Sequence, residues 1–328
     1  MPVSRKLLGQ GQEPFPRIAM GCVDIVIVNW NAGQQLRECV DSVIQCGGSL
    51  VSRIVVIDNG STDGSEGAVD GLPDVTLIRA GENLGFGRAC NAGAGLVSGE
   101  FILFLNPDAR VFPSTLAISL GFMRQPENSR VGICGVQLVD EDGHVVRTCA
   151  RFPSARGFVS HAVGVDRIIP AFGHFMHEWD HATTREVDQV IGAFFLVRRN
   201  VFEALNGFDE RFFVYFEEVD FSYRAKQRGW SSVYCADAQA FHAGGGTSRQ
   251  VKGRRLFYSL RSRLLYAFKH FNPLAITTVL LATLLVEPLT RSVLAMVHYS
   301  WARLKETWSA YGMLLRWLPS LIFEGAKR

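Results

Sequence analysis

The sequence predicts an α/β fold: a mostly parallel sheet flanked by helices, with a helical extension at the C-terminal end. Two observations predict the sheet. Short apolar runs typical of buried strands alternate with helical stretches between Val23 and Leu105. Polar turn residues such as Asn and Asp follow several of these runs directly. A third observation predicts the extension, because the chain from Ser248 to Arg328 is first basic and then apolar.

The expected elements of the first part follow one another in a regular order. Strands are expected at residues 23–28, 53–57, 75–79 and 101–105, and helices at 33–46, 61–70 and 86–97. Right-handed crossovers bring the carboxyl ends of parallel strands to one edge of the sheet, where ligands bind. Three of these ends carry polar side chains: Asn29-Trp30-Asn31, Asp58-Asn59-Gly60-Ser61 and Asn106-Pro107-Asp108.

The pattern changes after Val131. Two apolar stretches, 131–139 and 144–152, are expected to form a hairpin around Glu141-Asp142-Gly143, and residues 153–186 are expected to be irregular. Further elements are expected as strands at 190–199 and 230–235 and as helices at 201–205, 216–228 and from 248 onward.

Composition excludes some classes of protein. A formal net charge of +3 does not suggest a nucleic-acid binder. Seven cysteines, an odd number without a C-x-x-C pair, indicate a reduced, cytoplasmic chain. Residues 1–21 lack the apolar core of a secretory signal and are expected to form a flexible tail.

The region 249–328 is expected to be basic, amphipathic and helical. No acid lies between Asp237 and Glu287, and seven bases do: Arg249, Lys252, Arg254, Arg255, Arg261, Arg263 and Lys269. Such a block indicates an anionic partner, either lipid headgroups or phosphates. No stretch has the roughly 18 uninterrupted apolar residues of a membrane span. The apolar segments and their tryptophans therefore predict an anchor on an anionic membrane surface; a helical cap or a homodimer contact is the alternative.

Two glycine-containing segments follow the strands. Residues 58–65 can bind a nucleobase or ribose through Asp58, or can form a capped turn; both interpretations remain open. Residues 81–93 fail the dinucleotide-binding pattern, because Cys90 stands at the third glycine position. Their glycines still allow close approach of a phosphate at a helix start, and Arg88 adds a positive charge.

Candidate metal ligands and bases come later in the chain. Asp108 follows a buried strand, where one carboxylate suffices to hold a divalent cation that also binds a nucleoside diphosphate. Asn106 stands where a second carboxylate would be. Glu217, Glu218 and Asp220 lie among aromatic residues, and the resulting desolvation suits a general base; stabilisation by the helix dipole is the alternative.

Histidines offer two further sites. His242, followed by three glycines, can ligate a metal or serve a structural role. His177, Glu178 and His181 match the H-E-x-x-H pattern of zinc hydrolases, which requires a helix carrying both histidines on one face. The surrounding sequence is loop-like, so this is the weaker interpretation.

Seven of these segments together resemble the family 2 glycosyltransferases, and within them the rhamnosyltransferase-like branch. In chain order, between residues 23 and 248, they are I27-VNWN, V56-IDNGSTDGS, N83-LGFGRACNAG, F104-LNPDA, G192-AFFLVRR, G207-FDERFFVYFEEVDFSYRAKQRGW and H242-AGGGTS. The resemblance implies a GT-A, Rossmann-like domain over 22–248, with a nucleotide-sugar half at about 22–112 and an acceptor half at about 113–248.

The resemblance also implies roles for individual residues. A Mg²⁺ or Mn²⁺ ion would bind Asp108, with His242 assisting, and Glu218 would be the base, with Glu217 as the alternative. The nucleotide-sugar would contact Asn29, Trp30, Asn31, Asp58, Asn83, Gly85, Phe86, Arg88 and Asn106. The acceptor would contact Gly192, Ala193, Phe194 and Asp220.

The implied enzyme is an inverting, metal-dependent hexosyltransferase on the inner face of the cell membrane. It would move rhamnose from dTDP-rhamnose, or a sugar from a UDP-sugar, to a hydroxyl of a glycan or lipid-linked glycan in cell-envelope polysaccharide synthesis. Two other classes fit less well. A nucleotide-sugar pyrophosphorylase would need a glycine- and lysine-rich phosphate loop near the N-terminus, and an inactive binding module would need no base.

Overall fold

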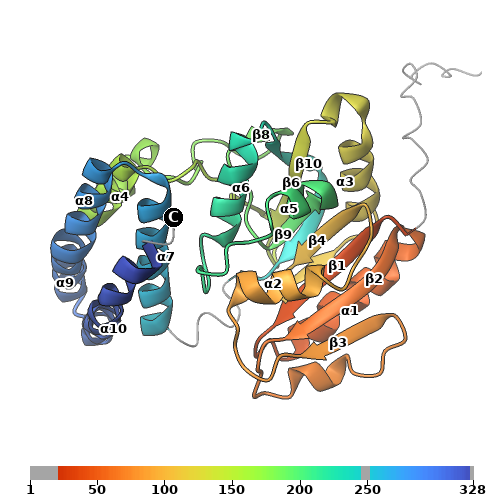
Figure 1. The fold of residues 1–328 in the computed structure, drawn as a ribbon, viewed down its shortest axis with the longest axis horizontal. Coiled ribbons are helices and arrows are strands. Elements are labelled where there is room, and N and C mark those ends of the chain that lie inside the picture. Colours follow the sequence, from red (N-terminus) through yellow and green to blue (C-terminus); the bar gives the residue numbers. More distant parts are fainter. Residues whose placement is uncertain (1–20, 245–251, 326–328) are drawn as a thin grey trace, which may run out of the picture.

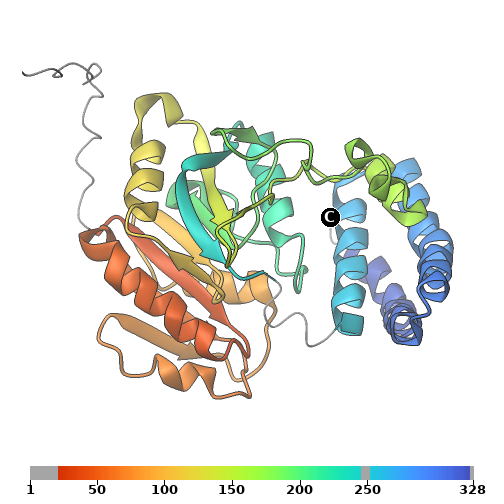
Figure 2. The same cartoon turned by 180° about the vertical axis from the view of Figure 1, so that it is seen from behind.

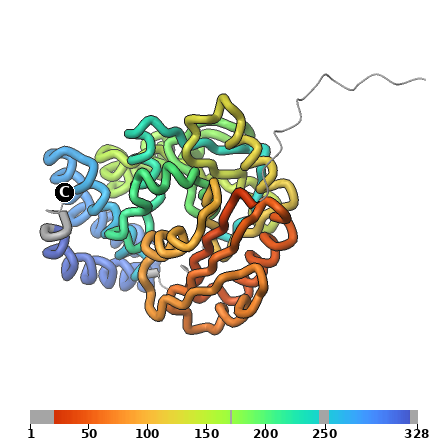
Figure 3. The backbone as a smooth tube through the Cα atoms, turned by 45° about the vertical axis from the view of Figure 1, so that its right-hand side comes forward, coloured from red at the N-terminus to blue at the C-terminus, as the bar shows by residue number. Residues whose placement is uncertain are grey.

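The computed structural model describes residues 21–244 and 252–325 (Figure 1). The expected flexible tail, apart from Gly21, lies outside the described residues. Residues 245–251, which include Arg249 and two of the three glycines after His242, also lie outside them. The rest forms a sheet unit and, beside it, a group of helices. Figure 3 shows these two groups side by side.

A mixed sheet occupies the centre of the first unit. Its order in the described residues is β3 (Val75–Arg79), β2 (Val51–Asp58), β1 (Val23–Asn29), β4 (Phe101–Leu105), β9 (Phe194–Arg198), β6 (Val131–Val139), β10 (Ser231–His242) and β5 (Ala109–Val111). Two short strands, β7 (Val145–Val146) and β8 (Arg185–Val187), pair with β6 and β10. The four expected N-terminal strands are parallel and adjacent. Asn29 pairs with Asp58 in the β1–β2 register, so the expected meeting of strand ends is confirmed.

Helices cover both faces of the sheet. α1 (Gln34–Gly47) and α3 (Thr115–Arg124) contribute apolar side chains to the core on one face (Figure 2). α2 (Phe86–Ala94), α5 (Arg199–Ala204) and α6 (Glu217–Gln227) contribute to the core on the other face. There the rings of Phe104, Phe195, Phe202, Phe208 and Phe221 pack against one another in tilted and edge-to-face pairs. Strands β1, β2, β4 and β10 are thus held between two apolar layers, which fixes their polar carboxyl ends in place.

The C-terminal region forms a third core. It contains α7 (Lys252–His270), α8 (Pro273–Leu281), one π-helical turn (Ala282–Val286), α9 (Glu287–Val297) and α10 (Trp301–Gly325). The expectation of a helical extension is confirmed. α4 (Ala155–Val163) packs against α8 and α9, so this helix joins the C-terminal group although it lies far earlier in the chain (Figure 1).

Several sequence-based expectations need correction. Residues 153–186 were expected to be irregular, but they contain α4, whose first turn is capped by the Ser154 hydroxyl, and the start of β8. The helix expected at 61–70 is only a 3₁₀ turn, Ser65–Ala68, because Asp63 and its neighbours fold into capped turns. The strand expected from residue 190 begins at Phe194. The strand expected over 144–152 covers only Val145–Val146.

One helical run is long and apolar enough, by length and composition, to cross a membrane. An 18-residue window within Pro273–Val297 has a mean hydropathy of 1.7, and 28% of this window is buried inside the protein. The run still lacks the roughly 18 uninterrupted apolar residues of the expectation, because it contains Glu287, which is 1% exposed and pairs with Arg263 and Arg291. Buried core helices of soluble proteins satisfy the same criterion.

Candidate active site

A pocket of about 510 Å³ opens at the edge of the sheet where the carboxyl ends of β1, β2, β4 and β10 meet the segment before α6. Of the site residues expected from sequence, the lining contains Trp30, Asn83, Gly85, Phe86, Asn106, Asp108, Gly192, Ala193, Glu217, Glu218 and His242. Outside the lining lie Asn29, Asn31, Asp58, Arg88, Phe194 and Asp220. The strand ends and the start of α6 are thus brought to one cavity.

Asp108 and His242 form one corner of the pocket. β5 begins one residue after Asp108 and pairs antiparallel with the end of β10, where Ala109 faces His242. This pairing sets His242 Nε2 3.3 Å from Asp108 Oδ1, and each side chain is about one-tenth exposed. Two ligands of one octahedral ion, each about 2.1 Å from it, are about 3 Å apart. The pair can therefore hold one divalent cation and leave the other positions for phosphate oxygens and water.

Glu217 and Glu218 begin α6 on another side of the pocket. Glu217 is only 4% exposed, while Glu218 is partly exposed. One carboxylate oxygen of each, Oε2, has no hydrogen-bond partner within the described part of the chain. Burial raises the pKa of both carboxyls, and the neighbouring Glu218 raises that of Glu217 further. Two desolvated acids that line a pocket, each with one oxygen lacking a hydrogen-bond partner, are suited to accept a proton from a bound group.

The chain that leads into α6 is strained. Tyr215 and Phe216 have φ angles of 67° and 72°, in the left-handed region that side chains other than glycine adopt rarely. Such conformations cost about 1–3 kcal/mol each and persist where the surroundings impose them. Here Ser262 of α7 donates a hydrogen bond to the carbonyl of Val214, 2.8 Å away. The strained turn directs the first residues of α6, including both glutamates, toward the pocket.

The loop before α2 supports this turn. Gly85 has a φ of 85°, and a Cβ there would lie 2.5 Å from the carbonyl oxygen of Phe213. The next residue, Phe86, donates its backbone N–H to that same oxygen over 2.6 Å. Asn59 fixes the loop, because its amide accepts from the N–H of Leu84 and donates to the side chain of Asn83. Only glycine allows the two loops to approach this closely.

A polar layer lies beneath the lining at the ends of β1 and β2. The amide of Asn29 donates to Asp58 Oδ1 over 2.9 Å and to the hydroxyls of Ser61 and Ser65. Asn31, with a φ of 51°, accepts from the N–H of Thr62. Asn29 and Asp58 are 0% and 5% exposed. In this structure the pair organises the turn next to the pocket.

Three other expected residues have different surroundings. Arg88 is more than half exposed and lies 3.7 Å from Glu210, outside the lining. Phe194 belongs to the sheet core at 1% exposure. Asp220 is fully buried and pairs with Arg224, Lys269 and His270. Although burial opposes it, these partners lower the pKa of Asp220. The geometry favours a structural role for Asp220 in joining α6 to α7.

The H-E-x-x-H segment does not have the geometry of a zinc-hydrolase site. Residues 177–181 form turns rather than a helix. The His181 ring accepts from the Cys149 N–H and contacts the Trp179 carbonyl, and burial lowers its pKa. Glu178 instead pairs with Arg151. The two histidines therefore cannot act as i, i+4 ligands of one ion.

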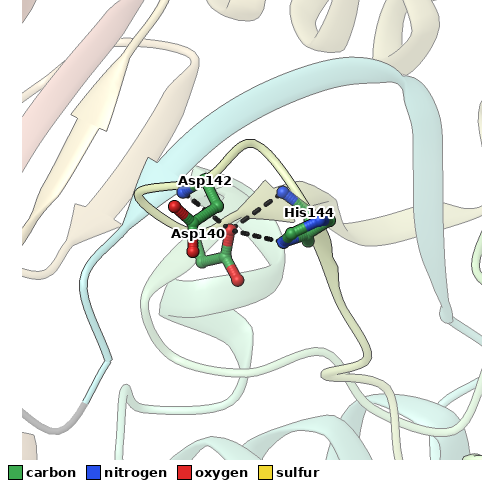
Figure 4. Close-up of side chains that lie close together, drawn as sticks. All are labelled: Asp140, Asp142 and His144. Atoms are coloured by element: carbon green, nitrogen blue, oxygen red, sulfur yellow. Dashed lines mark hydrogen bonds and ion pairs between the residues drawn. The ribbon is translucent and has the colours of Figure 1, made fainter.

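Figure 4 shows a second group of possible metal ligands, Asp140, Asp142 and His144, on the turn between β6 and β7. Asp140 Oδ1 accepts the backbone N–H groups of Asp142 and His144, at 3.1 and 2.8 Å. The carboxylate thereby closes the hairpin that the sequence predicts. Because these hydrogen bonds account for the cluster, it is a capped turn at the surface.

Sequence reasoning missed part of the lining. The sequence predicts Asn59 only as part of a turn, and Gln35 lies in a helix with no distinguishing pattern. Phe213 and Tyr215 belong to an aromatic run that does not mark them as pocket residues. Arg254, Arg255 and Tyr258 come from α7, which the sequence assigns to a separate region. The signal for the arginines was present as the acid-free basic block, but its location depends on the packing of α7.

Comparison with known proteins agrees with this geometry. The family model "Glycosyl transferase family 2" matches residues 24–205, more than half of the chain. N-acetylglucosaminyl-diphospho-decaprenol L-rhamnosyltransferase of Mycobacterium tuberculosis H37Rv is 32% identical over 241 residues, covering 66% of this chain and 75% of that protein. Rhamnosyltransferase WbbL of Escherichia coli K12 is 26% identical over 171 residues, covering 51% of this chain and 61% of that one.

Solved structures share the fold. The mannosyltransferase PcManGT of Pyrobaculum calidifontis, in complex with GDP-Man and Mn²⁺, has a TM-score of 0.52 and 18% identity, covering 96% of this chain and 84% of that one. GalNAc-T7 with UDP, GalNAc and Mn²⁺ has a TM-score of 0.51 and 18% identity, covering 76% and 50%. The architecture is therefore of the GT-A type, and with the family match it places this chain in glycosyltransferase family 2, in its rhamnosyltransferase-like branch.

Proposed function

We propose that this glycosyltransferase moves rhamnose from dTDP-rhamnose to a hydroxyl of a glycan or lipid-linked glycan in cell-envelope polysaccharide synthesis, with inversion at the anomeric carbon. The observation that carries the proposal is the shared pocket, which combines a carboxylate–imidazole corner with two desolvated acids, each with one oxygen lacking a hydrogen-bond partner. The rhamnosyltransferase relatives support the choice of sugar. A UDP-sugar is the alternative donor.

The acids suggest how the proton is handled. Glu218, which is partly exposed, is the better placed of the pair to reach an acceptor, and Glu217 is nearly inaccessible. In the proposed reaction Glu218 takes the proton of the acceptor hydroxyl as its oxygen forms a bond to the anomeric carbon. The bond between that carbon and the diphosphate breaks on the opposite face, and the diphosphate leaves with the electron pair. One displacement of this kind inverts the configuration.

Asp108 and His242 are the residues that would hold a divalent cation. Their 3.3 Å separation and shared access to the pocket fit a carboxylate–imidazole ligand pair. When bound, the ion would neutralise charge on the leaving diphosphate. Imidazole is a better ligand for transition metals than for Mg²⁺, so we favour Mn²⁺. The two related structures named above were determined with Mn²⁺.

Glu218→Gln tests the base assignment. Removal of a general base is expected to lower kcat by about 10²–10⁴-fold, while calorimetric affinity for dTDP with Mn²⁺ stays unchanged. Near wild-type turnover would contradict the assignment.

Asp108→Ala is the matched variant, and it should weaken Mn²⁺-dependent dTDP binding. Unchanged affinity would remove Asp108 from the metal site. Turnover assays with dTDP-rhamnose and a UDP-sugar then identify the donor.

We further propose that the C-terminal helices bind the inner face of the cell membrane peripherally. Their described surface exposes many large apolar side chains: Leu274, Leu281, Leu285, Leu289, Val293, Met296, Val297, Trp301, Trp308 and Leu315. Exposed apolar area of this extent marks a membrane or protein contact. Co-flotation with anionic liposomes tests the proposal. Absence of flotation at low salt, together with a dimer in sedimentation analysis, would instead favour the homodimer contact.

A further inference from the structure

We propose that Arg254 and Arg255, in the first turns of α7, bind a substrate diphosphate in the pocket. The inference rests on the proposed function in one respect, namely that a substrate carrying a diphosphate enters this pocket. It adds a binding role for a helix that lies outside the residues matched by the family model.

The charges of the lining support this role. Its carboxylates are Asp108, Glu217 and Glu218, and its guanidinium groups, within the described residues, are those of Arg254 and Arg255. A diphosphate brings about two negative charges next to these acids. One divalent cation at Asp108 cannot screen both phosphates from every side. The arginines lie on the α7 wall, whereas Asp108 and His242 lie at the ends of β4 and β10, so the two sources of positive charge come from different elements.

The bonding state of the arginines also supports it. The other α7 cations whose side chains the structure describes are engaged: Arg263 with Glu287, Lys269 with Asp209 and Asp220, and Arg261 with the Arg211 carbonyl. Arg254 and Arg255 are exposed, and neither makes a hydrogen bond or ion pair to any residue that the structure describes. Their N–H donors are therefore available to a ligand. The planar fork of arginine matches the geometry of phosphate oxygens.

α7 is held firmly against the part of the chain that carries the acids. The Tyr258 ring stacks on Phe213 with centroids 4.6 Å apart and a tilt of 19°. Ser262 bonds the Val214 carbonyl, and Lys269 bonds Asp209 over 2.6 Å. Tyr258 follows Arg254 and Arg255 by about one helical turn. These contacts fix the helix that carries both guanidinium groups relative to Glu217 and Glu218, which preorganises the site.

Two substrates could supply the diphosphate: the nucleoside diphosphate of the donor, or a lipid diphosphate on the acceptor. The experiment separates them with two double variants. One combines Arg254→Ala with Arg255→Ala. The other combines Arg254→Lys with Arg255→Lys, which keeps the positive charges but removes the planar guanidinium donors. Arg130→Ala, at an exposed residue just before β6 and outside the lining, serves as the control. For each protein, calorimetry gives the Kd of dTDP and UDP with Mn²⁺. Kinetics give the KM of a lipid-diphosphate-linked glycan and of the same glycan without phosphate.

Loss of two charged hydrogen-bond donors is expected to weaken diphosphate binding roughly 10- to 100-fold, with the Lys variant in between and Arg130→Ala unchanged. A raised Kd for dTDP or UDP identifies the donor as the source. An unchanged Kd, with loss of the KM advantage of the lipid-diphosphate acceptor, identifies the acceptor. If neither quantity changes in an active, folded double variant, the inference is overturned while the proposed function stands. If the wild-type protein binds no nucleoside diphosphate and transfers no sugar, the proposed function itself fails.

Discussion

Replacement of Glu217 by Gln should stabilise the fold at neutral pH, although it alters the pocket. Burial, and then the charge of Glu218, raise the pKa of Glu217 well above the usual value for glutamate, which is about 4.3. The folded protein therefore holds this proton more tightly than the unfolded chain does. Stability is greatest when both states are protonated, and it falls as the pH rises from the unfolded-state pKa toward the folded-state pKa. Gln has the shape of the protonated acid and carries no charge at any pH.

The magnitude follows from the size of the pKa difference. Each unit by which the folded-state pKa exceeds the unfolded-state pKa lowers stability above the folded pKa by about 1.4 kcal/mol. For a domain of the size of the sheet unit, 1 kcal/mol corresponds to roughly 2–4 °C in Tm. The residue is 4% exposed, so solvent screening reduces this effect little. The variant should match the wild type near pH 4 and exceed it increasingly from pH 5 to pH 8.

Urea unfolding of both proteins from pH 4 to pH 8.5 measures the difference. Glu141→Gln is the matched control, because Glu141 is exposed on the turn between β6 and β7 and should leave the pH profile unchanged. Equal pH profiles for wild type and Glu217→Gln would refute the reasoning, since they would mean that Glu217 titrates at its usual pKa. A variant less stable at pH 8 would show that the carboxylate has a compensating partner.

Three further outcomes are expected. Gly85→Ala should destabilise the protein by at least about 1–3 kcal/mol from backbone strain, plus the overlap with the Phe213 carbonyl; Gly81→Ala, at a similar φ of 78° in open space, should lose the strain part alone, and equal losses would show that the close approach is unimportant. Asp220→Asn should cost about 3–5 kcal/mol in urea unfolding, because it leaves buried cations unpaired, and a loss under 1 kcal/mol would contradict the role of Asp220 in joining α6 to α7. Asn29→Ala should lower thermal stability by removing three hydrogen bonds, and it should weaken dTDP binding only indirectly; an affinity loss without a stability loss would indicate direct contact.

The sequence predicts the sheet unit well where apolar runs are separated by turn residues. The adjacent ends of β1 and β2 follow from strand order alone, and Asn29 and Asp58 do lie side by side. The sequence does not predict α4, because that helix is held by packing against α8 and α9, which come more than a hundred residues later in the chain. β5 is missed for a similar reason: three residues show no period, and β5 exists through its pairing with β10.

The sequence predicts those site residues that directly follow strands, but not those whose position depends on packing between distant segments. Strand-end residues such as Asp108 reach the pocket because topology fixes where strands end. The acids at the start of α6 are recognisable as a cluster, but sequence spacing does not reveal which of them face the pocket. Asp220 turns instead to Lys269 and His270, which lie about 50 residues further along the chain. Only the packing of α7 against α6 separates it from Glu217 and Glu218.

Because α7 lines the pocket, the unit that contains the complete pocket extends beyond the sheet into the C-terminal helices. The family match stops at residue 205, before both glutamates, His242 and the arginine-bearing helix. A truncated protein cut near that residue, or at the sheet–helix junction near 248, would lose at least one wall of the cavity. Hybrids that exchange the C-terminal helices between relatives would likewise exchange the part of the pocket lining that α7 supplies. One wall of the pocket can thus vary in sequence while the sheet stays the same.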